Sequence, residues 1–172
     1  NESVPEFVFF AVSFFSSSRA VLVLGDEGLQ VFHVRKRSVK QLAYLPWNTH
    51  EFEGALEQLL VKKTGRAPVV VLNDMVEQHY RKEYLLKVGF LERKSVLKRR
   101  LGLAFPSYPI RAALKLSGKK QRVDDKPGTP YLFAATPTSA AFLKTFNVVR
   151  SSGAPIVGLY FFRCIEIKNL VS

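Results

Sequence analysis

Half of the chain's positive charge lies in a quarter of its length, and apolar residues run through that charge at helical spacing. Residues 81–122 hold 13 of the 26 Lys and Arg but only two acids. Within 90–105, apolar residues recur at i, i+4, i+7 and i+8, which predicts a helix with one buried face and a cationic outer side. Burial is expected for Leu97, Leu101, Ala104 and Phe105, and exposure to water for Lys94, Lys98, Arg99 and Arg100.

Composition bounds the rest of the chain. With 172 residues, 47% of them hydrophobic, and 14 Phe, the chain can build the core of one domain. The single Cys164 excludes an internal disulfide, and the acidic start lacks the cationic region of a signal peptide, so a reducing cytoplasmic setting is expected. A net charge of +12 attracts nucleic acid, an anionic membrane or an acidic protein patch, and charge alone does not choose among these partners.

Strand patterns fill the first 47 residues. Short apolar runs are separated by serine-rich, glycine-rich and basic turns, so an antiparallel meander is the simplest expectation. A helix should follow, with Asn48 and Glu51 as a capping box and Gly65 after its end. The fully apolar run 68–72 is typical of a buried central strand. The expected strands are 7–14, 19–24, 29–35 and 39–45.

The second half continues the alternation of helices and strands. Asn73 and Asp74 are expected to close the central strand and to open a helical segment through Tyr80. After the basic helix come strands at 110–116 and 131–135, which flank a mobile loop, and a last helix that starts at Thr136–Pro137 and ends at Gly153. A strand over 154–162 completes the order. A mixed sheet flanked by helices, an α/β fold of the actin-like or ribonuclease H-like kind, accounts for this order.

Three segments together resemble a known family. The segments 71–83, 93–114 and 152–160 are similar to the cytoplasmic actin-like domain of inner-membrane assembly proteins in type IV pilus and type II secretion machines. Within this family, the segments resemble the bundle-forming pilus biogenesis protein C more than they resemble the secretion L protein or the pilus M protein. The resemblance spans most of residues 19–162 and consists of a strand, basic helix and strand pattern without a catalytic signature.

The resemblance implies a scaffold. Residues 1–172 would be a single cytoplasmic domain of a longer protein, tethered by a following membrane helix. Such a domain would recruit the assembly ATPase and contact the polytopic platform protein, with anionic lipid of the inner leaflet as a further contact. On this hypothesis the partner-binding residues are Arg93, Lys94, Lys98, Arg99 and Arg100.

The residues give no pattern of an active site. Actin-like ATPases hold phosphate with an acid and a glycine in the turn after the first strand, whereas this chain has Ser13 and Phe15 there. Asp74 follows a strand and is better explained as a helix cap than as a metal ligand. His33, His50 and His79 show no metal spacing, and Cys164 has no nucleophile and base pattern near it. We therefore expect no catalysis, no cofactor and no metal.

Two other hypotheses remain. The first is a nucleic-acid-binding module of ribonuclease H-like fold, in which the same cations contact phosphate. This hypothesis requires exposed aromatic residues for base stacking, but Phe90, Phe105 and Tyr108 are better explained as core or turn residues. The second is an ATPase with an unusual phosphate loop. Neither the oligomeric state nor any specific nucleic acid is indicated.

Overall fold

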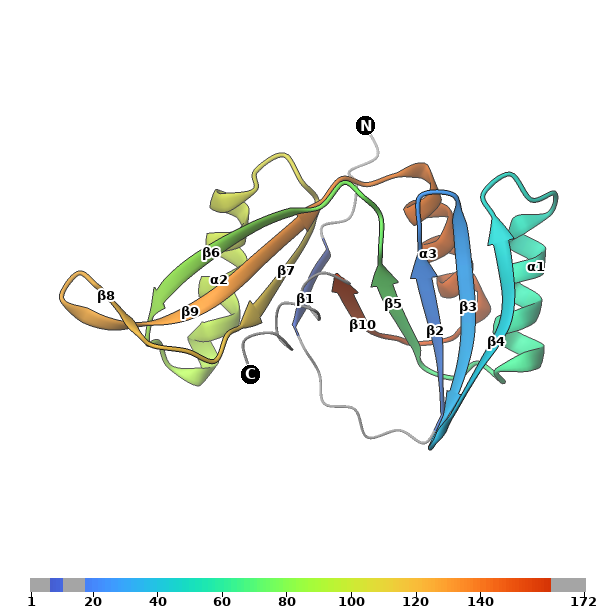
Figure 1. The fold of residues 1–172 in the computed structure, drawn as a ribbon, viewed down its shortest axis with the longest axis horizontal. Helices are drawn as coiled ribbons and strands as arrows, with labels where there is room; N and C mark the ends of the chain where they lie inside the picture. The colour runs from blue at the N-terminus through green and yellow to red at the C-terminus, as the bar shows by residue number, and fades with distance from the viewer. Residues whose placement is uncertain (1–6, 11–17, 162–172) are drawn as a thin grey trace. The chain divides into compact units, whose positions relative to one another are not determined.

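The computed structural model describes residues 7–10 and 18–161, which form two compact units. Of these residues, 7–10 and 77–138 form unit 1, and 18–76 together with 139–161 form unit 2. Each unit contains one five-stranded sheet and at least one helix (Figure 1). The architecture is therefore mixed α/β, as predicted.

In unit 2 the sheet has the order β10-β5-β2-β3-β4. The central strand β5 pairs in parallel with both β10 and β2, while β2, β3 and β4 form an antiparallel meander. Helices α1 and α3 contact each other, and the rings of Phe142 and Phe146 stack on α3 at 4.3 Å between centroids. The elements are β2 (Ser18–Leu24), β3 (Gly28–Arg35), β4 (Ser38–Pro46), α1 (Phe52–Gln58), a π-helix η1 (Leu59–Lys63), β5 (Val69–Asn73), α3 (Ala140–Ser152) and β10 (Ile156–Phe161).

In unit 1 the sheet has the order β1-β7-β9-β6, with the short β8 paired to β9. Strand β1 runs parallel to β7, and the other pairs are antiparallel. The elements are β1 (Phe7–Phe10), β6 (His79–Leu86), α2 (Phe90–Ala104), β7 (Ile110–Lys115), β8 (Gln121–Val123) and β9 (Lys126–Thr136).

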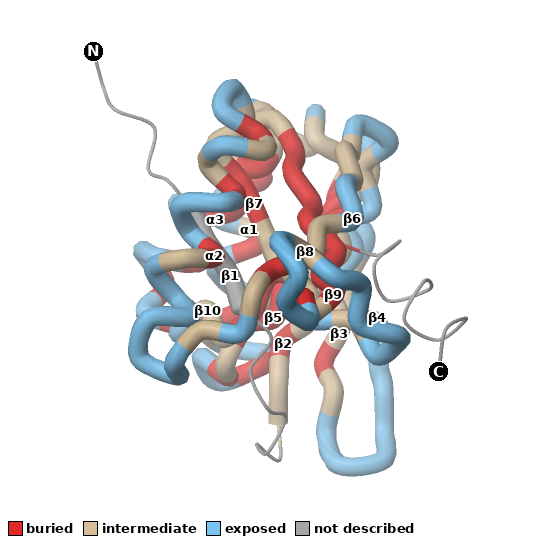
Figure 2. Tube along the Cα trace, turned by 90° about the vertical axis from the view of Figure 1, so that its left-hand side faces the viewer, coloured by how far each residue is buried: buried red, intermediate tan, exposed pale blue. Residues whose placement is uncertain are grey.

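Each unit has its own core, and Figure 2 shows the buried parts of the trace in red. In unit 2, Ala20, Leu22 and Leu24 alternate along β2 and are fully buried, as the period of two in a strand requires. In unit 1, Leu97 and Leu101 of α2 pack with Phe133 of β9. The apolar stripe predicted for the basic helix is therefore its buried face, and α2 is fixed on the sheet by it.

Several local predictions were wrong. Residues 7–10 leave the meander and pair in parallel with β7 in the other sheet. No helix opens at Asn73 and Asp74, because the chain continues directly into β6. The supposed mobile loop 117–130 contains a hairpin, in which Asp124 and Asp125 both have positive φ, as a two-residue hairpin turn requires.

The predicted starts of α1 and α3 were also misplaced. Helix α1 begins at Phe52 after Glu51, which has a left-handed conformation, and no side chain caps it. Helix α3 begins at Ala140, where the Ser139 hydroxyl accepts a hydrogen bond from the Phe142 N–H at 3.0 Å. Thr136 instead ends β9, and its hydroxyl donates to the Glu77 carbonyl at 2.7 Å. The predicted end of the last helix at Gly153, with φ of 76°, is confirmed.

The buried Arg111 of β7 holds the end of α2. Its Nε donates to the carbonyl oxygens of Phe105 at 3.0 Å and Tyr108 at 2.6 Å, and a second guanidinium nitrogen lies 3.5 Å from the Pro106 oxygen. These carbonyls follow the last turn of α2, where a cation is also favoured by the helix dipole. Arg111 therefore links β7 to the turn that ends α2.

Replacing Arg111 with Met should lower the free energy of unfolding by about 2–4 kcal/mol, because it leaves buried carbonyl groups without a charged donor. Urea denaturation at neutral pH measures this loss. The control Arg99→Met changes an exposed arginine of α2, and its free energy of unfolding should stay within about 0.5 kcal/mol of wild type. Equal losses in both variants would contradict the role assigned to Arg111.

Candidate functional site

The five cations proposed to bind a partner are all exposed on α2. Because α2 is fixed by Leu97 and Leu101, the direction of the core defines where each cation points. At about 100° per residue, Arg93 and Arg100 fall roughly 60–80° to one side of that direction. On the same basis, Lys94 and Lys98 fall roughly 40–80° to the other side, and Arg99 points directly away from the core. The five cations thus surround the exposed part of the helix in three groups.

Arg100 shares a carboxylate of β6 with Arg81. Glu83 lies 2.6 Å from Arg81 and 3.5 Å from Arg100, with its own side chain only 16% exposed. One of the two acids in the basic segment thus neutralises part of the charge on this side of α2. Arg100 is therefore less available to an acidic partner than its place in the sequence suggests.

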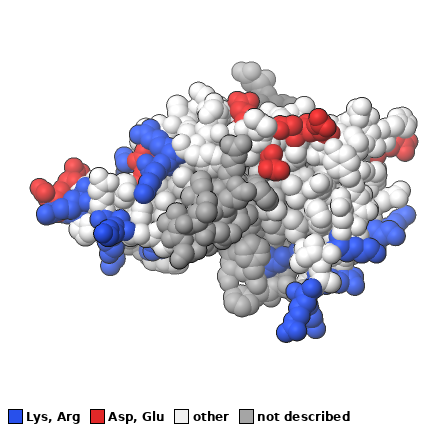
Figure 3. Space-filling view, in the orientation of Figure 1, with Lys and Arg blue, Asp and Glu red and all other residues white. Residues whose placement is uncertain are grey.

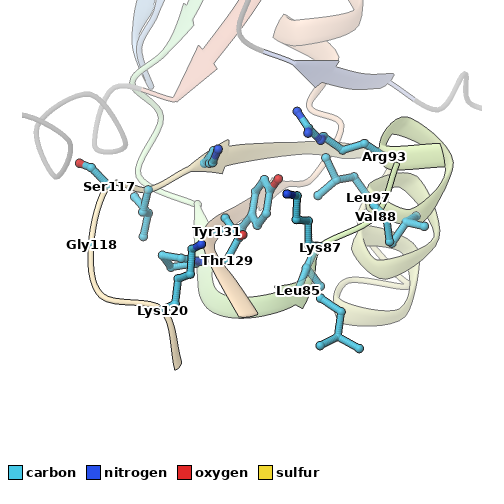
Figure 4. A pocket seen from close by; sticks show the side chains of 15 residues that line it. Leu85, Lys87, Val88, Arg93, Leu97, Ser117, Gly118, Lys120, Thr129 and Tyr131 are labelled. Atoms are coloured by element: carbon cyan, nitrogen blue, oxygen red, sulfur yellow. The ribbon is translucent and has the colours of Figure 1, made fainter. Parts of the chain in front are cut away.

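Beside the start of α2 lies a hollow of about 300 Å³, here called the basic pocket (Figure 4). It is formed where the ends of β6, β7 and β9 meet α2. Leu85, Leu97 and Tyr131, which belong to the unit 1 core, contribute apolar surface to it. Its cations are Lys87, Arg93, Lys115 and Lys120, and no acid lines it.

The sequence identified only Arg93 among these four cations as a site residue. Lys87, Lys115 and Lys120 belong to the same basic stretch, but they come together only through the pairing of β7 and β9 and the placement of α2. The charge density of 81–122 was a signal for them. Their convergence was not visible, because it depends on long-range strand pairing.

The start of α2 also carries two exposed apolar side chains. Phe90 is 82% exposed and Leu91 is 90% exposed. The interpretation of Phe90 as a core or turn residue was therefore wrong, whereas Phe105 is buried as expected. The Arg93 guanidinium lies 6.0 Å from the centre of the Phe90 ring, within reach of a cation–π interaction.

Unit 2 has a second hollow, of opposite charge. It measures about 360 Å³ and contains Asp26, Glu27 and Asp74, at the β2–β3 turn and the end of β5. In Figure 3, acidic atoms gather over this end of unit 2. The Asp26 carboxylate accepts from the Val76 N–H at 3.2 and 3.3 Å, so it links the β2–β3 turn to the segment that follows β5. Asp74 does not cap a helix as predicted, since none follows it.

Among residues 7–10 and 18–161, no group of three or more His, Cys, Asp or Glu is arranged to hold a metal. No helix within these ranges is long and apolar enough to cross a membrane. Ser13 and Phe15, the basis of the prediction about a phosphate loop, lie outside the described residues.

His33 is buried in the sheet of unit 2 and is neutral there. Its Nε2 accepts a hydrogen bond from the Arg35 Nε at 3.3 Å and lies 2.8 Å from the Ser18 hydroxyl, which must therefore be the donor. Burial lowers the pKa of His33 below 6.5, and the neighbouring Arg35 charge lowers it further. With no acid to orient its ring among these contacts, the Ser18–His33 pair reads as structural.

Comparison with known proteins places the fold. No protein-family model and no curated protein matches the sequence. A chain of the PilM–PilN type IV pilus biogenesis complex matches in structure with a TM-score of 0.56 and 14% identity, over 88% of this chain and 49% of that one. This chain thus spans about half the length of that relative, and at such identity the likeness concerns the fold.

Two further structures are similar at lower scores. One is the cytoplasmic domain of EpsL, an inner-membrane component of the Vibrio cholerae type II secretion system, with a TM-score of 0.48, 13% identity, and coverage of 84% of this chain and 57% of that one. The other is a Bacteroides thetaiotaomicron protein of actin-like ATPase fold and unknown function, with a TM-score of 0.43, 8% identity, and coverage of 90% and 55%. The predicted mixed α/β fold class is confirmed, and the fold matches that of the pilus biogenesis chain.

The neutral state of His33 should make folding stability depend on pH. Because its pKa is lower in the folded chain than the 6.5 of the unfolded chain, the folded state resists protonation and stability is lost as pH falls below about 6.5. His33→Gln cannot titrate, so its unfolding free energy should fall less than that of wild type between about pH 7.5 and 5. Parallel urea titrations across this range measure the difference, and identical slopes would contradict it.

Proposed function

We propose that this chain is a non-catalytic scaffold domain on the cytoplasmic side of an inner membrane, in a type IV pilus or type II secretion machine. Support comes from the structural likeness to a chain of a pilus biogenesis complex and from the three segments with the family pattern. Within this class we place it nearest the bundle-forming pilus C type. On this proposal a membrane helix of about 20 apolar residues follows residue 172 in the parent protein.

The observation that carries the proposal is the rigid support of an exposed cationic helix. α2 packs through Leu97 and Leu101, and Arg111 holds its end, so the backbone positions from which its outer cations extend are fixed before any partner binds. A preformed surface loses little conformational freedom on binding and gives charge-based selectivity. Lys98 and Arg99, on the outer side of α2, would dock an acidic patch of the assembly ATPase or the platform protein.

A nucleic-acid-binding module is the second candidate, and one observation favours it. Phe90 is exposed beside Arg93, so an aromatic ring and a cation are available for base stacking. A single exposed aromatic ring offers much less than the row of stacking platforms that binds single strands tightly. We therefore keep the scaffold as the main proposal.

Reversing Lys98 and Arg99 to Glu should abolish binding to the partner protein without loss of folding. Both side chains are exposed, and surface changes of this kind usually alter stability by no more than about 0.5 kcal/mol. Titration of wild type and double mutant against the candidate ATPase, the platform protein and mixed oligonucleotides measures the effect.

The matched control is Lys62→Glu with Lys63→Glu, an adjacent and exposed basic pair on η1 in unit 2. It makes the same change in net charge and should leave partner binding intact. Unchanged binding of the Lys98/Arg99 variant would move the interface off this helix. Tight binding of wild type to single strands at roughly 0.2 M salt would favour the nucleic-acid module instead.

The chain should neither bind nor hydrolyse ATP measurably. The physical reason is that Ser13 replaces the acid that orders metal-bound water, and Phe15 replaces the glycine that lets backbone amides reach phosphate. Isothermal calorimetry with magnesium and ATP tests this expectation. Binding at micromolar affinity would contradict it and restore the ATPase hypothesis.

A further inference from the structure

The start of α2 combines features that the scaffold proposal does not use. Phe90 and Leu91, here called the wedge, are the first two residues of α2 and are almost fully exposed. They follow Val88, which lines the basic pocket and is half-buried. Apolar side chains are therefore present both in the pocket and at the adjacent start of the helix.

Cations surround this apolar surface. In sequence, Lys87 lies before the wedge and Arg93 after it. Both side chains line the basic pocket, together with Lys115 and Lys120 (Figure 4). All four side chains are exposed, and within the described ranges none of them pairs with a carboxylate. The pocket thus presents four positive charges around an apolar floor.

This combination matches the interface of an anionic bilayer. Large apolar side chains enter the boundary between headgroups and acyl chains, while Lys and Arg keep their charges at the level of the lipid phosphates. Glu92, which follows the wedge directly in sequence, is exposed in the first helical turn and does not line the pocket. An acidic protein would meet the same charges, but a wedge exposed to this extent would need a matching apolar cavity in that protein.

We propose that the start of α2 is a membrane-contact site for anionic phospholipid. The wedge enters the bilayer interface, and lipid phosphate lies among Lys87, Arg93, Lys115 and Lys120. This site is distinct from Lys98 and Arg99, which the scaffold proposal uses for a protein partner. It deepens the proposed function by giving unit 1 its own contact with the membrane, and it can fail without the scaffold failing.

The test is co-flotation of the 172-residue chain with vesicles. Wild type should bind vesicles of mixed phosphatidylglycerol and phosphatidylcholine and should not bind pure phosphatidylcholine. Phe90→Ser with Leu91→Ser should reduce binding to the anionic vesicles at least about tenfold, because the apolar contribution is lost. Lys87→Glu with Lys120→Glu should reduce it at least about tenfold as well.

Each pair has a matched control. Leu103→Ser with Val39→Ser removes two exposed apolar side chains away from the start of α2, and Lys62→Glu with Lys63→Glu reverses two exposed lysines on η1 in unit 2. Neither should reduce vesicle binding more than about twofold, apart from the general effect of net charge. Circular dichroism melting of every variant verifies that the chain still folds.

Several results would overturn the proposal. Absence of vesicle binding by wild type would do so, and so would a wedge variant that binds as well as wild type, since attraction would then be purely electrostatic. Binding of soluble glycerol phosphate without vesicle binding would assign the pocket to a small anion. Partner binding that is lost with Lys98 and Arg99 while vesicle binding persists would support two separate surfaces.

Discussion

The placement of α2 is the constraint on which the rest of unit 1 depends. Two independent interactions set it: the apolar stripe of Leu97 and Leu101 against β9, and the guanidinium of Arg111 at the carbonyls beyond its last turn. The stripe fixes the rotation of the helix about its axis, because any other rotation would expose leucine and bury cations. Arg111 fixes its position along the axis. Together they determine the side of α2 from which each of its cations projects.

The sequence predicted elements with local signals well and those with long-range partners poorly. The stripe of α2, the apolar β5 and the glycine end of α3 each have a signal within a few residues, and all three were predicted correctly. By contrast, β1 shows only an apolar run, and its parallel partner β7 lies about 100 residues further along the chain. Among the described strands, the edge strand β6 pairs only with β9 and is rich in charge, as edge strands often are, so its alternation is weak.

The same reasoning explains how much of the candidate sites was foreseen. The exposure of Lys94, Lys98, Arg99 and Arg100 followed from helical periodicity and is confirmed, whereas the role of the five α2 cations as a binding site stays a prediction. The basic pocket could not be foreseen, because Lys115 and Lys120 reach it only through the hairpin of β8 and β9 and the pairing of β7. Phe90 was misjudged because it continues the apolar stripe by spacing, yet the helix begins there and nothing in the sheet extends far enough to cover it.

The division of charge around α2 bears on how one basic helix could serve two partners. A uniform cationic face would bring a membrane and an acidic protein into competition for the same side chains. Arg93 and Arg100 project from the same side of α2, and there Glu83 of β6 pairs with Arg100. Lys98 projects from the opposite side, and Arg99 points away from the core. The pocket cations and the outer cations are thus separated by helix geometry and by one acid. Charge reversal at one group would therefore weaken its own contact and affect the other only through screened, longer-range attraction.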